Sequence, residues 1–134
     1  MKKEINNVEI IGKLEPTISQ RVRKFNADAG TKLDRGMMSF AESKNEVNMI
    51  LEEVQELRDA MMANDKKEIC DALADIVYVA YGTAAKLGID LDKALERVCI
   101  SNDTKYIDGK LVKNEDGKII KGDNYQPPNL EGCY

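Results

Sequence analysis

The sequence predicts an all-α protein, a bundle of four to five helices followed by a small hairpin-like C-terminal appendage. Two observations support this fold class. Apolar residues recur at helical spacing over most of residues 17–105, and residues typical of helix ends stand between these segments. Helix-favouring residues, including six Met, are also plentiful. With 134 residues, we expect one domain, with its helical core at about 17–105 and its appendage at about 106–134.

Two helices are expected in the first half of the chain. The first covers residues 17–29, where Ile18, Val22 and Phe25 form one apolar face and Gly30 follows the last turn. After a connector, the second covers about 39–63. Its apolar residues fall within an arc of roughly 120° and predict a buried core stripe. The stripe consists of Val47, Ile50, Leu51, Val54, Leu57 and Met61.

Two more helices are expected in the second half. The third covers residues 66–87 and ends at Gly88, and because it is apolar nearly all round it should lie centrally in the bundle. Cys70 lies inside this apolar run, and we interpret it as a small core residue. Asp90 is suited to cap a short fourth helix over about 91–100.

After these helices the pattern changes. Short apolar pairs separated by Asp-Gly turns over residues 106–122 indicate a small hairpin, and an extended tail follows. The sequence shows no internal repeat and no low-complexity segment. The appendage is therefore expected to differ in structure from the helical core.

The composition narrows the classes of function. A net charge of −4 argues against nucleic-acid binding through a basic surface. No stretch reaches 18 apolar residues and the start lacks an apolar signal region, so no membrane role is expected. The three cysteines are widely spaced and favour neither a disulfide framework nor a zinc motif. We therefore expect a reduced, cytoplasmic protein.

Carboxylates interrupt the apolar helix expected at 66–87. Asp71 and Asp75 lie one turn apart, and Glu68 falls within about 60° of them on a helical wheel. Asp is unfavourable inside a helix, and a buried carboxylate is costly unless it is paired, hydrogen-bonded or bound to a metal. The alternatives to a metal site are a satisfied polar pair and an interface salt bridge.

A second acidic cluster, Glu52, Glu53 and Glu56, lies on the helix expected at 39–63. If the two helices pack antiparallel with their acidic edges together, a divalent cation would relieve the repulsion between them. The alternative is an ordinary solvated face. Because the sequence contains no histidine, the ligands would be oxygen atoms, which favours Mg²⁺ or Mn²⁺ and hence phosphate chemistry.

The order of these acids resembles that of a known family. The motif Glu-Glu-x-x-Glu, then Glu-x-x-Asp, then a further Asp is similar to the all-α nucleoside triphosphate pyrophosphohydrolases. The motif residues are Glu52, Glu53, Glu56, Glu68, Asp71 and Asp75. Later segments resemble the MazG-like, phosphoribosyl-ATP pyrophosphohydrolase-like branch. They are Gly88-Ile-Asp, Ser101-Asn-Asp-Thr-Lys, Glu115-Asp-Gly-Lys and Pro127-Pro-Asn-Leu, and the resemblance covers about residues 18–130.

This resemblance implies a dimer, or a dimer of dimers, that cleaves a nucleoside triphosphate between the α- and β-phosphates with Mg²⁺. It further implies that Glu53 and Glu56 bind the metal. For the second ligand pair we favour Asp71 and Asp75, with Glu68 as a close partner, because two alignments of the motif are possible. The Glu-x-x-Asp spacing selects Glu68 and Asp71, whereas a second alignment selects Asp75 and places Ala72 where a Glu is expected.

The resemblance also suggests roles around the metal. Glu52 or Glu53 would activate the attacking water, and Asn102 and Lys105 would contact the phosphates, although an ordinary helix cap and a solvated lysine are the alternatives. Phe25 resembles an aromatic residue near the base, but core packing is the favoured interpretation. Two other functions are considered: a phosphoribosyl-ATP pyrophosphatase of histidine biosynthesis, and a helical oligomer that binds nucleotide or metal without turnover.

Overall fold

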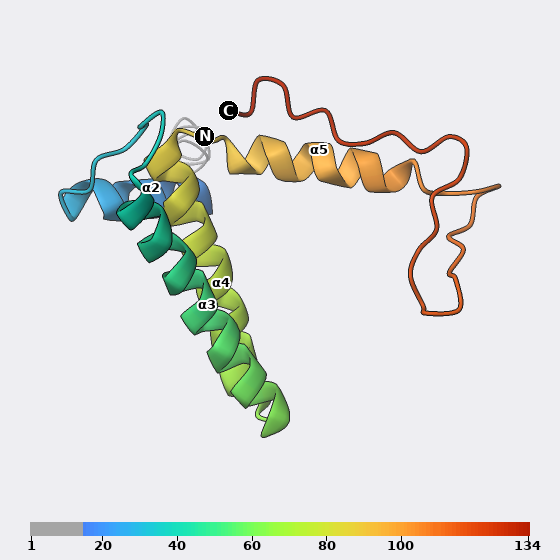
Figure 1. Ribbon diagram of the computed structural model, residues 1–134, viewed down its shortest axis with the longest axis horizontal. Coiled ribbons are helices and arrows are strands. Elements are labelled where there is room, and N and C mark those ends of the chain that lie inside the picture. The colour runs from blue at the N-terminus through green and yellow to red at the C-terminus, as the bar shows by residue number, and fades with distance from the viewer. Residues whose placement is uncertain (1–14) are drawn as a thin grey trace, which may run out of the picture. The chain divides into compact units, whose positions relative to one another are not determined.

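A computed structural model of the chain describes residues 15–134, which form four α-helices (Figure 1). These are α2 (Ile18–Asp28), α3 (Phe40–Met62), α4 (Lys66–Leu87) and α5 (Leu91–Asp103). No strand is found among the described residues, so the predicted all-α class is confirmed. The first fourteen residues of the predicted domain lie outside the described part.

Local sequence sets the ends of these helices. Thr17 and Gln20 form a capping box, in which the Thr17 hydroxyl accepts from the Gln20 N–H and the Gln20 side chain accepts from the Thr17 N–H. Gly88 adopts a left-handed conformation, φ 73°, that closes α4. The other N-caps are Ser39, Asp65 and Asp90. The four predicted helices are confirmed, and α5 runs to Asp103, three residues past its predicted end.

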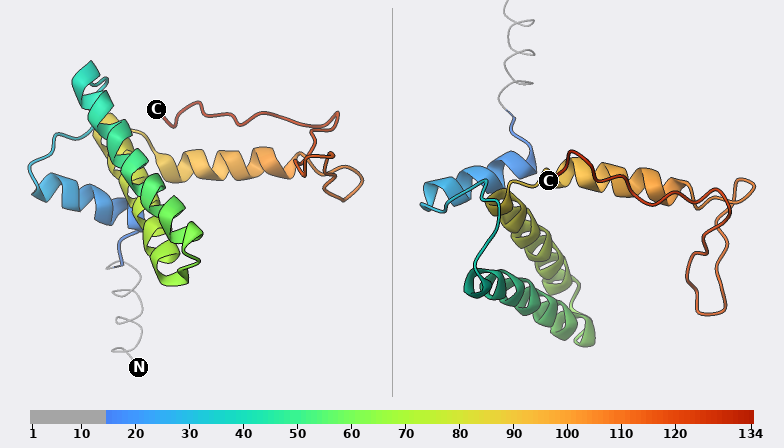
Figure 2. Two further views of the ribbon diagram at one scale, coloured as in Figure 1. Left: turned by 60° about the horizontal axis from the view of Figure 1, so that its bottom comes forward. Right: turned by 45° about the horizontal axis from the view of Figure 1, so that its top comes forward.

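The chain divides into two compact units, one that extends to Ile89 and one that covers Asp90–Tyr134. In the first unit, α3 and α4 lie side by side and antiparallel, and α2 packs against α4 (Figures 1 and 2). The central place predicted for α4 within the bundle is therefore confirmed for this unit.

In the second unit, the C-terminal chain is hydrogen-bonded to both ends of α5. The buried Ser101 hydroxyl donates to the Gln126 carbonyl at 2.7 Å, and the Gln126 N–H donates to the Thr104 hydroxyl at 2.9 Å. At the other end, the Asp90 N–H donates to the Cys133 carbonyl at 2.8 Å. The tail is thus part of the packing of this unit.

The predicted hairpin is present only as isolated antiparallel bridges. Ile107 pairs with Lys110 across a turn in which Asp108 and Gly109 both have positive φ, and Lys113 pairs with Ile119. The apolar runs between the turns are two residues long, too short to extend the pairing into a strand ladder.

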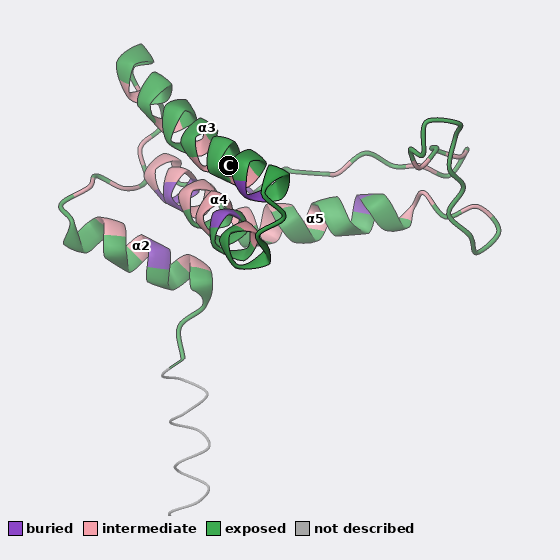
Figure 3. Ribbon diagram, turned by 90° about the horizontal axis from the view of Figure 1, so that it is seen from below, coloured by how far each residue is buried: buried purple, intermediate pink, exposed green. Residues whose placement is uncertain are grey.

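The core stripe predicted for α3 is not buried in the single chain (Figure 3). Val47 and Leu51 remain 56% and 55% exposed, so this prediction was wrong. The helix instead turns Glu46, Glu53 and Ala60 toward α4, and we call these three residues, spaced by seven, the seam. Ile50 and Leu57 of the stripe are half-buried, whereas its other members are exposed. The face of α3 that packs against α4 thus includes two carboxylates, and most of the apolar stripe is left exposed.

The contact surface of α4 is built from small residues. Ala72, Gly82, Ala84 and Ala85 are its buried members, and they allow the neighbouring helices to approach closely. Cys70 is exposed, so its predicted core role was wrong.

Within the described chain, no single helix is both long and apolar enough to cross a membrane, and only α4 and α5 taken together meet the criteria.

Candidate metal centre

Three carboxylates come together where α3 and α4 lie side by side. Glu53 and Glu56 are one turn apart on α3, and Asp75 lies on α4. One oxygen of each carboxylate lies within 4.8 Å of an oxygen of the other two. The antiparallel pairing of the helices produces this cluster, because the seam position Glu53 faces α4 at the level of Asp75. Oxygen atoms grouped in this way suit a hard divalent cation.

Glu53 is the least satisfied member of the cluster. Its Oε2 atom is buried and has no hydrogen-bond partner. Burial raises the pKa of Glu53, and the charges of Glu56 and Asp75 raise it further, followed by those of Glu52 and Asp71. A buried oxygen without a partner, surrounded by negative charge, fits a site whose cation supplies the missing partner.

The ion pairs described for residues 15–134 leave this cluster unneutralised. They join Arg23 to Asp34, Lys24 to Asp28, Arg35 to Glu42 and Lys86 to Glu46. None of these ion pairs includes Glu53, Glu56 or Asp75. The alternative in which Asp75 is neutralised by a basic side chain is therefore not found among them.

The remaining predicted acids lie beside the cluster. Glu68 and Asp71 are exposed on α4 and line an open hollow together with Glu56. Glu52 is exposed on α3, next to Glu53. The structure therefore brings Asp75 into the three-carboxylate group, but neither Asp71 nor Glu68. The role of each acid in metal binding or catalysis stays a prediction.

Asn102 and Lys105 belong to the second unit. Asn102 is exposed in the last turn of α5, and its backbone carbonyl accepts a hydrogen bond from the Lys105 N–H at 3.0 Å. Lys105 is half-buried just after the helix. Their proposed contact with phosphate stays a prediction.

An aromatic pair lies about one helical turn along α4 from Asp75. Phe25 of α2 is 62% exposed and meets Tyr78 edge to face, with ring centroids 6.0 Å apart. The core packing favoured for Phe25 was therefore wrong. Two hollows share this pair. Beyond the pair itself, one is lined by Ile18, Arg21 and Val22, and the other by Asn26, Met49, Val79, Gly82 and Lys86.

A polar contact between α3 and α4 near the start of α3 was not predicted from the sequence. Glu46 accepts from the Thr83 hydroxyl at 2.6 Å and from the Lys86 ammonium at 2.5 Å. We call these three residues the clasp. Its sequence signal was the position of Glu46, seven residues before Glu53 and therefore on the same side of the helix.

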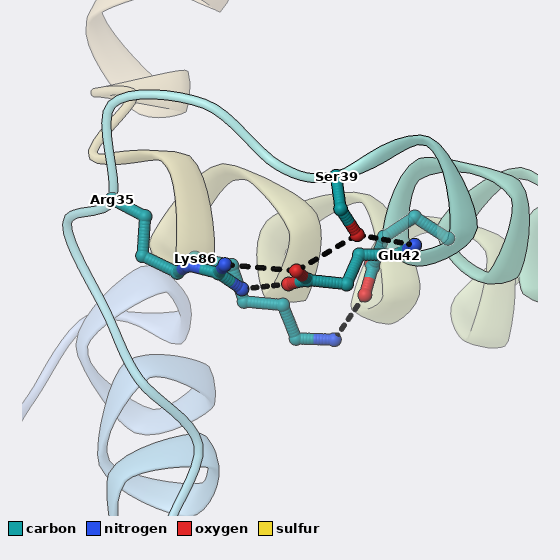
Figure 4. A network of polar contacts seen from close by, with 5 residues as sticks. Arg35, Ser39, Glu42 and Lys86 are labelled. Atoms are coloured by element: carbon teal, nitrogen blue, oxygen red, sulfur yellow. Dashed lines mark hydrogen bonds and ion pairs between the residues drawn. The ribbon is translucent and has the colours of Figure 1, made fainter.

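The connector between α2 and α3 joins the same region (Figure 4). Arg35 forms an ion pair with Glu42, and the Ser39 hydroxyl donates to Glu42 at 3.0 Å. The Arg35 N–H also donates to the Lys86 carbonyl at 2.8 Å. The start of α3 is thereby tied to the end of α4.

The fold and this site define an all-α protein with a candidate divalent-cation centre between two antiparallel helices. Residues 13–102 match the family model described as phosphoribosyl-ATP pyrophosphohydrolase. Because this match covers more than half of the 134 residues, the chain belongs to the phosphoribosyl-ATP pyrophosphohydrolase family. The resemblance derived from the acidic motifs is confirmed.

A viral protein also shares part of the sequence. An uncharacterized protein of Acanthamoeba polyphaga mimivirus is 51% identical over 49 residues, which make up 37% of this chain and 20% of that protein. The match thus spans one fifth of the length of this relative.

Proposed function

We propose that the chain hydrolyses a nucleoside triphosphate, a dNTP, between its α- and β-phosphates and so removes unwanted nucleotides in the cytoplasm. The products would be the nucleoside monophosphate and pyrophosphate. The observation that carries the proposal is the buried, unpartnered Oε2 atom of Glu53 within the carboxylate cluster. In a family of nucleotide pyrophosphohydrolases, such an atom is best explained as a ligand of a phosphate-binding cation.

Glu53, Glu56 and Asp75 would hold Mg²⁺, with Mn²⁺ as the alternative, and the adjacent Asp71 and Glu68 could contribute further oxygen ligands. When bound, the cation neutralises charge on the phosphates and on the leaving group. The carboxylates hold it at the junction of two helices, where a rigid scaffold limits their movement.

The water that attacks phosphorus must lose a proton. Glu52, or Glu53, accepts it, while the water oxygen bonds to phosphorus and the bond to the oxygen between the α- and β-phosphorus atoms breaks. In this proposal, Asn102 and Lys105 stabilise phosphate charge through a hydrogen bond and an ammonium group.

The exposed aromatic pair offers a surface for the base of the nucleotide. Phe25 and Tyr78 lie about one turn from Asp75 and border two hollows, so a planar ring bound there would keep its phosphates near the carboxylates. The aromatic surface therefore favours a substrate with a planar base, such as a nucleotide, over a phosphate compound that lacks one.

The test is incubation of the purified protein with a panel of ribo- and deoxyribonucleoside triphosphates and Mg²⁺, followed by detection of monophosphate and pyrophosphate. Asp75→Asn should abolish turnover. Asp28→Asn is the matched control, because Asp28 is an acid on α2 that pairs with Lys24 and lies outside both the cluster and the hollow beside it. Failure of the wild type to hydrolyse any of these nucleotides with Mg²⁺ or Mn²⁺ would overturn the proposal.

The family description supports a second candidate, the hydrolysis of phosphoribosyl-ATP in histidine biosynthesis. Rescue of a histidine auxotroph that lacks this enzyme would select it, and hydrolysis of dNTPs without rescue would select the first proposal. A third candidate is binding without turnover. It predicts a thermal shift with Mg²⁺ and nucleotide but no product.

We further propose that the protein is a homodimer or homotetramer, in which a second copy covers the exposed stripe of α3. Val47, Leu51 and Val54 of this stripe are 56%, 55% and 43% exposed, so the described part of the chain does not cover them. Such a surface is typical of an obligate interface. Light scattering after size-exclusion chromatography tests this proposal, and a monomer at micromolar concentration would contradict it.

A further inference from the structure

The seam contains two carboxylates that differ in whether their oxygen atoms have hydrogen-bond partners. Glu46 and Glu53 are seven residues apart, about 10.5 Å along α3, and both lie against α4. Both oxygens of Glu46 have partners, Thr83 and Lys86, whereas Oε2 of Glu53 has none. One carboxylate is therefore fixed by the protein, and the other is left for a ligand.

The distances along the two helices correspond. Thr83 lies eight residues after Asp75, about 12 Å along α4, so the clasp and the carboxylate cluster are similarly spaced on both helices. Because the clasp joins α3 to α4 directly, it opposes sliding of one helix along the other. That sliding would change the separation of Glu53 and Glu56 from Asp75.

Repulsion within the carboxylate cluster acts to separate the helices at their midpoint. At one end, α3 and α4 are joined by the short turn at residues 63–65, where the Asp65 N–H donates to the Ala60 carbonyl at 3.0 Å. At the other end, the clasp links the two helices directly through side chains. It is well protected, since the side chains of Lys86 and Glu46 are only 17% and 12% exposed.

We propose that Glu46, held by Thr83 and Lys86, is a positioning residue that keeps α3 and α4 in the register needed for Mg²⁺ binding at Glu53, Glu56 and Asp75. The proposal rests on the metal centre of the proposed function. It assigns Glu46 no contact with metal or substrate. Glu46 acts only by fixing the register of the two helices, and so the distances among the three carboxylates in the metal-free protein.

The test measures Mg²⁺ affinity directly, by calorimetric titration of the folded, metal-free protein without nucleotide. Glu46→Gln removes the ion pair and should weaken Mg²⁺ binding roughly five- to tenfold, the lower part of the usual range for coupling between separate sites. Thr83→Val removes only the hydroxyl and should weaken binding less. It also supplies a second variant if Glu46→Gln does not fold.

Two controls separate register from charge and from general stability. The charge swap, Glu46→Lys with Lys86→Glu, keeps the net charge and an ion pair between the helices, and should restore binding to within about twofold of the wild type. Val22→Ala weakens the packing of α2 against α4 without touching the clasp, and should lower stability while leaving the Mg²⁺ affinity unchanged.

The outcomes are distinguishable. If the wild type does not bind Mg²⁺, the metal centre and the proposed function fail together. If the wild type binds and Glu46→Gln binds equally well, only the positioning role is overturned. A swapped variant that binds as weakly as Glu46→Gln overturns it as well.

Discussion

Replacing Lys86 with methionine removes the ammonium group from the Lys86–Glu46 pair and keeps a side chain of comparable length. In the wild type, the two charged atoms are 2.5 Å apart, and both side chains are largely protected from water. The variant leaves the Glu46 carboxylate in the seam with only the Thr83 hydroxyl as a partner. The expected result is a marked loss of folding free energy, because a protected charge loses its counter-ion.

The Lys24–Asp28 pair on α2 is the comparison for the free energy that the Lys86–Glu46 pair contributes. Its charged atoms are also 2.5 Å apart, but its side chains are 76% and 65% exposed. An exposed pair of this kind contributes about 0.5 kcal/mol or less. Loss of one partner from a fully buried pair costs about 3–5 kcal/mol. Since the clasp keeps some exposure and one hydrogen bond, we expect Lys86→Met to cost about 2–3 kcal/mol.

Urea unfolding, followed by far-ultraviolet circular dichroism, measures the free energy of unfolding of Lys86→Met and of the comparison variant Lys24→Met. All samples should have the same protein concentration, because association changes apparent stability. Equal m-values are needed for the comparison. If Lys24→Met and Lys86→Met lose the same free energy despite their different burial, the reasoning is refuted.

Three further predictions concern the carboxylate cluster and the apolar stripe. Asp75→Asn should raise the melting temperature of the metal-free protein, because it relieves repulsion with Glu53 and Glu56, and should abolish stabilisation by Mg²⁺. The pKa of Glu53 is raised above its ordinary value of 4.5, so the folded metal-free state holds the proton more readily than the unfolded chain does. Relative to Glu53→Gln, wild-type stability should therefore increase as pH falls through the folded-state pKa, with the gain complete below about pH 4.5. Saturating Mg²⁺ should reverse this slope, because binding needs the ionised carboxylate. Leu51→Lys should dissociate the proposed oligomer, as measured by light scattering.

Each of these predictions has its own control. Asp28→Asn should leave the response to Mg²⁺ unchanged and change the melting temperature little, because its pair with Lys24 is exposed. For the pH series, a wild-type minus Glu53→Gln difference that stays flat would contradict the burial and repulsion argued for Glu53. For the oligomer, Lys24→Met alters an exposed charge on α2 and should leave the mass unchanged, whereas an unchanged mass for Leu51→Lys would contradict an interface at the stripe.

The helices themselves could be predicted because their ends are local. Thr17, Asp65 and Gly88 act through hydrogen bonds and dihedral angles of nearby residues, so the sequence contains the whole cause. The side of α3 that faces α4 depends instead on tertiary contacts. An apolar stripe predicts burial, but here a seam that includes Glu46 and Glu53 faces α4.

The carboxylate cluster could be predicted in part for the same reason. Spacing on each helix identifies Glu53 and Glu56 as one group and Asp71 and Asp75 as another. Which member of the second group meets the first depends on the register between helices, and that register is set by long-range contacts such as Glu46 with Lys86. Short-range spacing therefore left Glu68, Asp71 and Asp75 as alternatives, and the folded structure groups Asp75 with Glu53 and Glu56.

The connector before α3 lacks regular secondary structure, yet two of its amides are hydrogen-bonded to the last turn of α4. The Asp34 N–H donates to the Ala85 carbonyl at 3.1 Å, and the Arg35 N–H donates to the Lys86 carbonyl. These bonds predict slow hydrogen–deuterium exchange at Asp34 and Arg35. Since the acceptors lie at the end of α4 that carries the clasp, the exchange rates of these two amides would report the opening of the helix pair residue by residue, without any probe attached to the cation site.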